Sequence, residues 1–275
     1  MSVLVRNNVK VCGQGSEAIM FSHGYGCDQN MWRYVAPAFE RDYKVVLFDH
    51  VGAGNSDATA FDRRKYQTLS GYSDDVLEIC HELDLRKVTF VGHSVSSMIG
   101  VLAAIREPER FENLVMVGPS PRYINDSVYV GGFERNEIDG LLDMLDQNYL
   151  GWASAMAPAI MGNSDRPELA AELENSFCRT NPQIAKFFAR VTFLSDNRSD
   201  LSKVRTRTLV LQCSEDVIAP LSVGEFVHQQ ISESELVIMK ATGHCPNLSA
   251  PEETVREIKR FLASAPVSAR VSFAS

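Results

Sequence analysis

Residues 88–100 read VTFVGHSVSSMIG, and this stretch decides the fold. The apolar, β-branched run at 88–91 is typical of a buried strand, and the apolar residues that follow Ser94 are typical of a helix. A strand, a sharp turn and a helix place the serine Oγ at a helix N-terminus, where it can act as a nucleophile. Gly92 and Ser94 fit the pattern G-x-S-x-G, but Ser96 stands where that pattern has its second glycine.

The composition is that of an ordinary globular protein. The 275 residues are 45% hydrophobic and 23% charged, which suits one large α/β domain with a sizeable core. The formal net charge of −8 argues against nucleic acid or an anionic membrane as the main partner. No apolar run approaches the roughly 20 residues that span a bilayer, and the N-terminus lacks the apolar region of a signal peptide. We therefore expect a cytoplasmic protein.

No pattern in the chain indicates a cofactor or a metal. The six cysteines show no C-x-x-C spacing, so neither a metal site nor a disulfide framework is supported. The glycine-rich run at 49–56 lacks both the Lys-[Ser/Thr] of a P-loop and the spacing G-x-G-x-x-G. We interpret it as a structural turn.

Eight short apolar segments predict the strands of a mainly parallel sheet. They are residues 3–6, 9–12, 18–22, 43–48, 88–91, 114–118, 208–213 and 236–239. Asn7 and Asn8 are suited to a two-residue hairpin turn between the first two strands. Segments with helical spacing alternate with the later strands, at 29–39, 71–85, 221–231 and 251–263. This alternation predicts an α/β fold with helices on both faces of the sheet.

The alternation stops between about Arg122 and Ser195. Four short helices are predicted there, at 136–147, 151–160, 167–178 and 182–193. They are not sheet crossovers, so we expect a cap over the C-terminal edge of the sheet; a separate interaction domain is the alternative. The expected organisation is a core at 1–121, a cap at 122–195, the rest of the core at 196–263 and a flexible tail at 264–275.

A serine nucleophile needs a base, and the base needs an orienting carboxylate. In this arrangement the chain order is serine, acid, histidine. Asp216 follows the strand at 208–213, and His244 follows the strand at 236–239. Both loops leave the sheet at the edge that carries Ser94, so we predict a triad of Ser94, Asp216 and His244.

Rival residues are less well placed. Glu215 is the alternative acid. His23, His50, His81 and His93 precede the acid loop and break the expected order, whereas His228 falls within a predicted helix. We expect His93 to line the pocket beside Ser94.

The developing oxyanion needs hydrogen-bond donors. We predict the backbone N–H of Val95, directly after the nucleophile, and the N–H of Tyr25 in the glycine-rich loop after strand 18–22. The cap carries large apolar side chains that can face a cavity. The expected substrate-binding residues are His93, Phe133, Trp152, Met156, Phe193, Val217 and Ile218. Such a pocket is small, apolar and enclosed, which suits a compact ester or lactone.

Several motifs resemble the RsbQ family of α/β hydrolases. They are HGYGCDQ at 23–29, VGHSVSSMIG at 91–100, GPSPRY at 118–123, GGFE at 131–134, DRPE at 165–168 and GHCP at 243–246. The resemblance covers about residues 3–263 and extends to the plant karrikin and strigolactone receptors. It implies a four-helix cap, a Ser-Asp-His triad at the positions above and a closed hydrophobic pocket.

The resemblance also implies signalling. RsbQ-type proteins are positive regulators of a bacterial stress-response sigma factor and act with a PAS-domain phosphatase of the RsbP type, while the plant receptors perceive butenolides. Two hypotheses follow. The first is a serine hydrolase for a small ester or lactone, and the second is a ligand receptor whose slow or single-turnover hydrolysis recruits a protein partner.

Overall fold

Seven strands form one sheet in the order β1-β3-β2-β4-β5-β6-β7 in the computed structural model, which describes residues 1–264. The strands are β1 (Lys10–Cys12), β2 (Ala18–Ser22), β3 (Lys44–Leu47), β4 (Val88–His93), β5 (Phe111–Val117), β6 (Arg207–Glu215) and β7 (Ser234–Thr242). Only β1 runs antiparallel to its neighbour. All residues of β2 and β4 are buried, as expected for central parallel strands covered on both faces.

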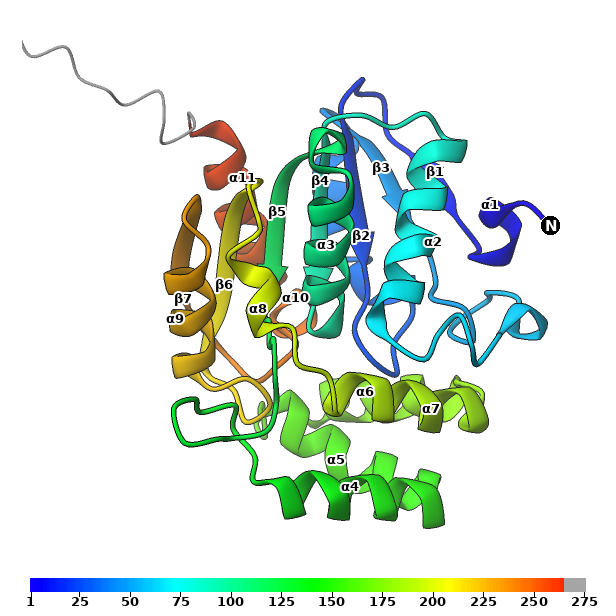
Figure 1. Ribbon diagram of the computed structural model, residues 1–275, viewed down its shortest axis with the longest axis vertical. Coiled ribbons are helices and arrows are strands. Elements are labelled where there is room, and N and C mark those ends of the chain that lie inside the picture. Colours follow the sequence, from blue (N-terminus) through cyan, green and yellow to red (C-terminus); the bar gives the residue numbers. More distant parts are fainter. Residues whose placement is uncertain (265–275) are drawn as a thin grey trace, which may run out of the picture.

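Helices cover both faces of this sheet. In Figure 1, α2 (Leu69–Glu82), α3 (Val95–Arg106) and α9 (Leu221–Gln230) lie in front of the sheet, and α11 (Pro251–Ala263) lies behind it. Two short helices lie in connections: α8 (Arg198–Leu201) precedes β6, and α10 (Pro246–Ser249) follows β7. The α/β class and the layered arrangement are therefore as predicted.

The first predicted strand is wrong, and the sheet has seven strands rather than eight. Residues 3–6 form a short helix, α1 (Val3–Arg6). The Ser2 side chain accepts a hydrogen bond from the Leu4 N–H, which caps the helix, and Arg6 Nη2 lies 2.8 Å from Asp75 Oδ1. Buried Asn7 donates to the Asp49 carbonyl at 3.0 Å, so it anchors the chain instead of turning a hairpin.

The loops that follow β2 and β3 contain 3₁₀ helices and turns and no α-helix. The predicted helix at 29–39 is two 3₁₀ turns, η1 (Gln29–Trp32) and η2 (Ala36–Phe39); two further 3₁₀ turns are η3 (Ala58–Ala60) and η4 (Pro108–Arg110). The glycine-rich run at 49–56 is a turn, as predicted. The Asp49 carboxylate organises it by accepting hydrogen bonds from the N–H groups of Gln29 (2.8 Å) and Asn55 (2.9 Å).

Between β5 and β6, four helices precede the short α8, and they lie at the positions that the sequence predicts. They are α4 (Arg135–Gln147), α5 (Tyr149–Met161), α6 (Pro167–Arg179) and α7 (Pro182–Phe193). Glu134 and Glu137 form a capping box at the start of α4, and Asn181 caps α7. Figure 1 shows these inserted helices as a separate layer beyond one end of the strands.

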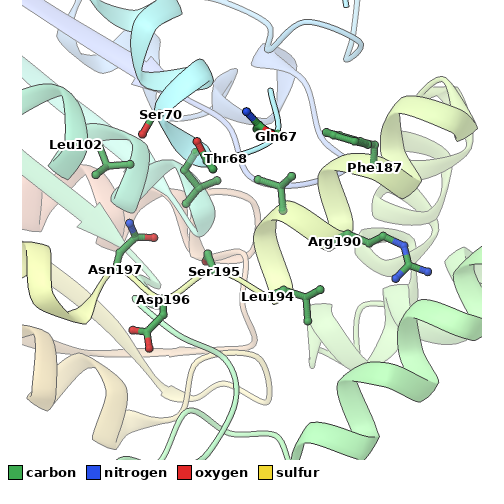
Figure 2. Close-up of a pocket in the computed structure, with 12 residues that line it drawn as sticks. Gln67, Thr68, Ser70, Leu102, Phe187, Arg190, Leu194, Ser195, Asp196 and Asn197 are labelled. Carbon is green, nitrogen blue, oxygen red and sulfur yellow. The ribbon is translucent and has the colours of Figure 1, made fainter. Parts of the chain in front are cut away.

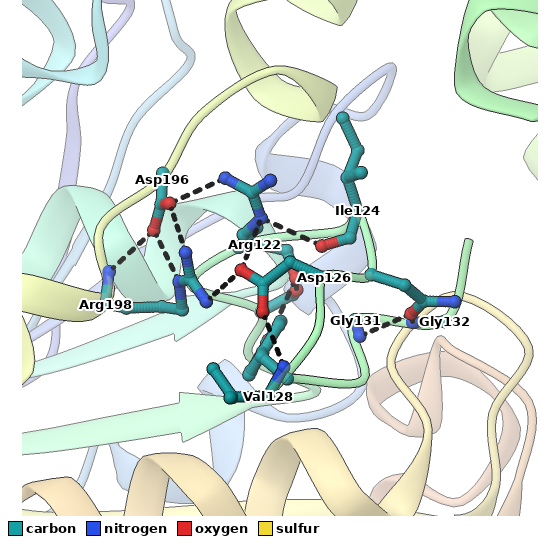
Figure 3. Close-up of polar contacts among 11 residues, drawn as sticks. Arg122, Ile124, Asp126, Val128, Gly131, Gly132, Asp196 and Arg198 are labelled. Carbon is teal, nitrogen blue, oxygen red and sulfur yellow. Dashed lines mark hydrogen bonds and ion pairs between the residues drawn. The ribbon is translucent and has the colours of Figure 1, made fainter. Parts of the chain in front are cut away.

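Ion pairs join the segments that lead into and out of the inserted helices (Figure 3). Arg122 Nη1 lies 2.6 Å from Asp196 Oδ2, and Arg198 Nη1 lies 2.7 Å from Asp126 Oδ2. The Asn197 N–H also donates to the Pro121 carbonyl at 2.8 Å. The segment that follows β5 is therefore bound to the segment that follows α7.

Within residues 1–264, none of the helices has the length and apolar character needed to cross a membrane. The predicted flexible tail lies almost wholly outside the described residues, since these end at residue 264.

Candidate active site

Ser94 occupies the sharp turn between β4 and α3. Its φ of 56° is unusual for a residue with a side chain, and such strained backbone is typical of functional sites. A Cβ at Gly92 would lie 2.5 Å from the Ser96 carbonyl oxygen, so the turn closes only with a glycine there. The Ser94 N–H donates to the Val117 carbonyl at 2.8 Å, which fixes the turn against β5.

The structure brings Ser94, His244 and Asp216 together. His244 Nε2 lies 2.8 Å from Ser94 Oγ, and His244 Nδ1 lies 2.7 Å from Asp216 Oδ2. The second carboxylate oxygen of Asp216 accepts hydrogen bonds from the N–H groups of Ile218 (2.8 Å) and Ala219 (3.1 Å). All three side chains are buried, whereas the alternative acid, Glu215, is exposed. The arrangement can pass a proton from the serine to the imidazole while the carboxylate orients the ring.

His93 holds the backbone that carries His244. Its Nε2 lies 2.7 Å from the His244 carbonyl oxygen, and because a carbonyl only accepts, this nitrogen carries the proton. Burial lowers the pKa of His93 to about 3, so the ring is neutral at physiological pH. A Cβ at Gly24 would lie 2.6 Å from His93 Nδ1, so the glycine lets the loop approach the ring.

The end of α5 lies against the same loop. The His244 N–H donates to the Ile160 carbonyl at 2.8 Å. Gly243 has a φ of +78°, and a Cβ there would lie 1.8 Å from the Met161 carbonyl oxygen. Asn163 Nδ2 donates to the Thr242 carbonyl at 3.1 Å. The position of His244 therefore depends on the inserted helices as well as on the sheet.

Two backbone N–H groups are free near Ser94. Among the described residues, the N–H groups of Tyr25 and Val95 have no hydrogen-bond acceptor. The Gly24 carbonyl lies 2.9 Å from His23 Nδ1. His23 Nε2 accepts from the His50 N–H at 3.0 Å, so the proton of His23 is on Nδ1 and donates to Gly24. Because the C=O and N–H of a trans peptide point in opposite directions, this bond also aims the Tyr25 N–H.

Ser96, the departure from the serine pattern, belongs to a buried polar cluster behind this loop. Its Oγ donates to the His23 carbonyl at 2.5 Å and lies 2.9 Å from both Ser22 Oγ and His50 Nε2. Burial lowers the pKa of His50 well below its usual value, so the cluster carries no charge. Ser96 therefore fastens helix α3 to the loop that carries Tyr25.

A small pocket lies at Ser94, with a cavity volume of about 30 Å³. Of the predicted residues, Tyr25, His93, Ser94, Trp152, Phe193, Ile218 and His244 line it. Phe133, Met156 and Val217 do not, and Val217 is 58% exposed. Val95, the residue after Ser94, is buried and does not line the pocket.

Sequence reasoning missed half of the pocket lining: Cys27, Tyr123, Ile160, Leu173, Phe177, Thr192 and Cys245. Leu173 and Phe177 stand four residues apart on α6, a spacing that places both on one helix face. This spacing is the sequence signal that could have identified Leu173 and Phe177 as pocket residues. Tyr123 and Cys245 sit in loops, where the backbone path decides which way a side chain points.

A larger hollow lies away from Ser94. Figure 2 shows this groove, of about 470 Å³, between the start of α2, helix α3 and the end of α7. Phe187, Leu194 and Arg190 are among the residues that line it, whereas Ser94, Asp216 and His244 are not. The groove is therefore separate from the candidate active site. Among the described residues, no group of three or more His, Cys, Asp or Glu side chains could hold a metal ion.

Comparison with known proteins identifies the family. Residues 17–251 match the family described as the alpha/beta hydrolase fold. The chain belongs to the α/β-hydrolase family. This hydrolase is 38% identical over 262 residues to a strigolactone esterase of Arabidopsis thaliana, covering 95% of this chain and 98% of the relative. It is 37% identical over 257 residues to a karrikin insensitive 2 receptor of Petunia hybrida, covering 93% and 95% of the two chains.

A similar solved structure supports the same family assignment. A hydrolase from Oleispira antarctica is 40% identical, with a TM-score of 0.93 over 96% of this chain and 97% of that chain. Matches at such identity and coverage include the inserted helices as well as the sheet. Enzymes are thus prominent among the relatives of this hydrolase, which include proteins named as esterases, an enol-lactonase and hydrolases.

Proposed function

We propose that this hydrolase cleaves a small hydrophobic ester or lactone through an acyl-enzyme on Ser94. The observation that carries the proposal is the hydrogen-bonded chain from Ser94 Oγ to His244 (2.8 Å) and from His244 to Asp216 (2.7 Å). A serine hydroxyl is a weak nucleophile by itself, and this geometry supplies the base and the group that orients the base.

In the first half of the reaction, Ser94 Oγ attacks the ester carbonyl while His244 Nε2 takes the hydroxyl proton. The N–H groups of Tyr25 and Val95 stabilise the oxyanion that forms. His244 then gives its proton to the departing alkoxide, and the acyl group stays on Ser94. In the second half, His244 accepts a proton from water, the hydroxide attacks the acyl carbonyl, and the carboxylic acid leaves as Ser94 recovers its proton.

The pocket supports a small, mostly apolar substrate. Aromatic and aliphatic side chains make up most of its lining, and Tyr25, Trp152 and Phe193 are at most 9% exposed. We propose that residues 122–195 act as a cap domain whose four helices close over this pocket. A cavity of about 30 Å³ holds roughly two water molecules, so a ligand the size of a lactone ring enters only when the cap or the lining side chains move.

A signalling role fits the same site. Relatives of this hydrolase are named both as an esterase and as a receptor, for strigolactone and karrikin respectively. We propose a role like that of RsbQ, in the cytoplasm, in which a PAS-domain phosphatase of the RsbP type docks on the cap. The alternative is a receptor for butenolide ligands of the karrikin or strigolactone type, with slow or single-turnover hydrolysis.

Hydrolysis of p-nitrophenyl acetate by matched variants tests the catalytic assignment. Ser94→Ala abolishes hydrolysis under this proposal, and Asp216→Asn lowers kcat by about 10⁴-fold because the imidazole loses its orienting carboxylate. Glu215→Gln, a neutralised carboxyl one residue away, keeps wild-type activity. Full activity in Ser94→Ala, or equal losses in the two acid variants, would show that the triad is assigned wrongly.

The time course separates the hydrolase hypothesis from the receptor hypothesis. Fast multiple turnover of a small ester favours the enzyme, whereas a long-lived covalent adduct in intact mass spectra after exposure to a butenolide favours the receptor. Variants of the exposed cap surface should then keep hydrolysis and lose binding to the phosphatase; unaltered binding would contradict docking on the cap.

A further inference from the structure

The pocket at Ser94 holds polar side-chain atoms that no described residue satisfies. They are Nδ1 of His93, which can only accept, and three groups that can donate: the hydroxyl of Tyr25, the indole N–H of Trp152 and the hydroxyl of Thr192. The three donor residues, Tyr25, Trp152 and Thr192, are 9%, 2% and 1% exposed, respectively. Buried polar atoms in folded proteins are nearly always hydrogen-bonded, so three unsatisfied donors around a single pocket call for a partner from outside the chain.

Packing alone does not explain the Tyr25 hydroxyl. The Tyr25 ring lies among aromatic rings, with centroids at 5.9 Å from Trp152, 5.8 Å from Phe188 and 5.9 Å from Phe193. A phenylalanine would make the same ring contacts without burying an unsatisfied hydroxyl. Burial raises the pKa of Tyr25 well above its usual value, so the hydroxyl keeps its proton and can donate.

The chemistry of these groups fixes what the partner must offer. The indole N–H of Trp152 can only donate, and the neighbouring phenylalanine rings supply no acceptor. A ligand that satisfies Trp152 and Tyr25 therefore brings an oxygen that accepts hydrogen bonds. This oxygen is not that of the reacting carbonyl, because the carbonyl faces the N–H groups of Tyr25 and Val95, and the Tyr25 hydroxyl stands at the far end of its own side chain.

We propose that the Tyr25 hydroxyl, assisted by the Trp152 indole N–H, forms a subsite for a second acceptor oxygen of the substrate. The inference rests on the proposed function, since it concerns the ligand of the same pocket. The preferred substrate is then a small ester or lactone that carries an ether or carbonyl oxygen apart from the bond that is cleaved. A purely hydrocarbon acyl chain leaves the two donors unsatisfied and is disfavoured.

Matched ester pairs test the subsite. Three p-nitrophenyl alkanoates (butanoate, pentanoate and hexanoate) are compared with the esters in which one chain CH₂ is replaced by oxygen (methoxyacetate, 3-methoxypropanoate and 4-methoxybutanoate). For each pair the readout is the ratio of kcat/KM for the ether ester to that for the alkyl ester. Taking this ratio cancels any effect that a variant has on both esters alike.

Tyr25→Phe removes one oxygen atom, and we expect it to lower this ratio about 2- to 10-fold for at least one oxygen position. Tyr72→Phe is the matched control, because Tyr72 is also a buried tyrosine with an unsatisfied hydroxyl but lies outside the pocket lining. We expect it to leave the ratio unchanged. An unchanged ratio in Tyr25→Phe at all three positions, or an equal fall in Tyr72→Phe, would overturn the subsite.

Binding separates failure of the subsite from failure of the proposed chemistry. In a Ser94→Ala background, the same esters are added and the rise in the unfolding midpoint is measured. The subsite predicts a larger rise with the ether ester than with its alkyl partner, and Tyr25→Phe in this background removes the difference. This result would support the subsite even if Ser94 proved not to be the nucleophile, whereas equal rises with both esters would refute it.

Discussion

Ser96 shows how a single residue can break a sequence pattern and still serve the site. The pattern G-x-S-x-G has glycine at this position, and the structure shows the Ser96 hydroxyl donating to the His23 carbonyl at 2.5 Å. His23 in turn precedes the loop whose Tyr25 N–H we propose as an oxyanion donor. The serine therefore acts as a positioning residue, remote from the substrate.

Ser96→Ala should lower kcat for p-nitrophenyl acetate with little change in KM, because Ser96 does not line the pocket. We expect a fall of roughly 10-fold, less than the roughly 100-fold loss that follows removal of an oxyanion donor. Ser73→Ala is the control, since Ser73 is a buried serine whose hydroxyl has no hydrogen-bond partner within residues 1–264. A wild-type kcat in Ser96→Ala would mean that the cluster is not needed to place the loop.

Individual site residues differ in how far the sequence could predict them. Ser94, Asp216 and His244 follow from chain order, because each comes directly after a parallel strand and those strand ends share one edge. The pocket lining does not follow in this way. Val217 and Ile218 are neighbours, yet Ile218 is 5% exposed and Val217 is 58% exposed. The Asp216 carboxylate accepts the Ile218 N–H and so turns the loop, a detail that apolarity alone does not encode.

At the scale of elements, the end of α5 supports the loop that bears His244. Gly162 ends this helix with a φ of +66°, and a Cβ there would lie 3.0 Å from Gly243 Cα. Gly162→Ala should therefore destabilise the protein by about 1–2 kcal/mol and also lower kcat, because the loop must shift. Urea unfolding and ester hydrolysis measure the two effects.

Gly140→Ala is the matched control for that substitution. Gly140 lies inside α4, and a Cβ there would meet nothing within 4 Å. We expect this variant to be as stable as the wild type or up to about 1 kcal/mol more stable, with unchanged activity. If the two alanine variants behave alike, the contact between α5 and the His244 loop does not matter for the site.

The ion pairs between the connections to the inserted helices predict a pH dependence. The hydrogen bond from Arg198 is the main cause that lowers the pKa of Asp196 from 3.8 to about 2. A carboxyl whose pKa is lower in the folded state stabilises that state above its unfolded pKa, and this contribution is lost as the pH falls from about 4 towards 2.

Asp196→Asn should therefore lower the free energy of unfolding by about 1 kcal/mol at pH 7, a value reduced for solvent screening, and by progressively less below pH 4. Asp42→Asn, which removes an exposed pair with Arg41, should have no measurable effect. Urea unfolding at several pH values measures both differences. A deficit in Asp196→Asn that stayed constant from pH 7 to pH 3 would contradict the assignment.

Most elements were predictable because buried strands and amphipathic helices leave periodic patterns. The exception at 3–6 is instructive. Its residues, Val-Leu-Val-Arg, are apolar enough for a strand, but Ser2 caps a helical turn and Arg6 reaches Asp75, 69 residues further along the chain. A local sequence pattern cannot predict a contact at that separation. Here the tertiary contact outweighed the strand propensity of residues 3–6.

At the scale of the whole molecule, the candidate site lies between two layers. The sheet supplies Ser94 and Asp216, and the loop that carries His244 is held by the sheet on one side and by α5 on the other. The sequence predicted the two layers, but the packing between them sets the small volume of the pocket, about 30 Å³. Under our proposal, ligand entry moves the layers relative to each other, and the same movement offers a partner protein a changed surface.

The central claim is that Ser94 carries the acyl group. The most direct test is to mix the protein with p-nitrophenyl acetate, stop the reaction with acid during turnover and map the modified peptide by mass spectrometry. We predict one acetyl group on Ser94 in the wild type and none at this position in Ser94→Ala. Rapid hydrolysis by the wild type with Ser94 unmodified, and unchanged hydrolysis in Ser94→Ala, would contradict the account.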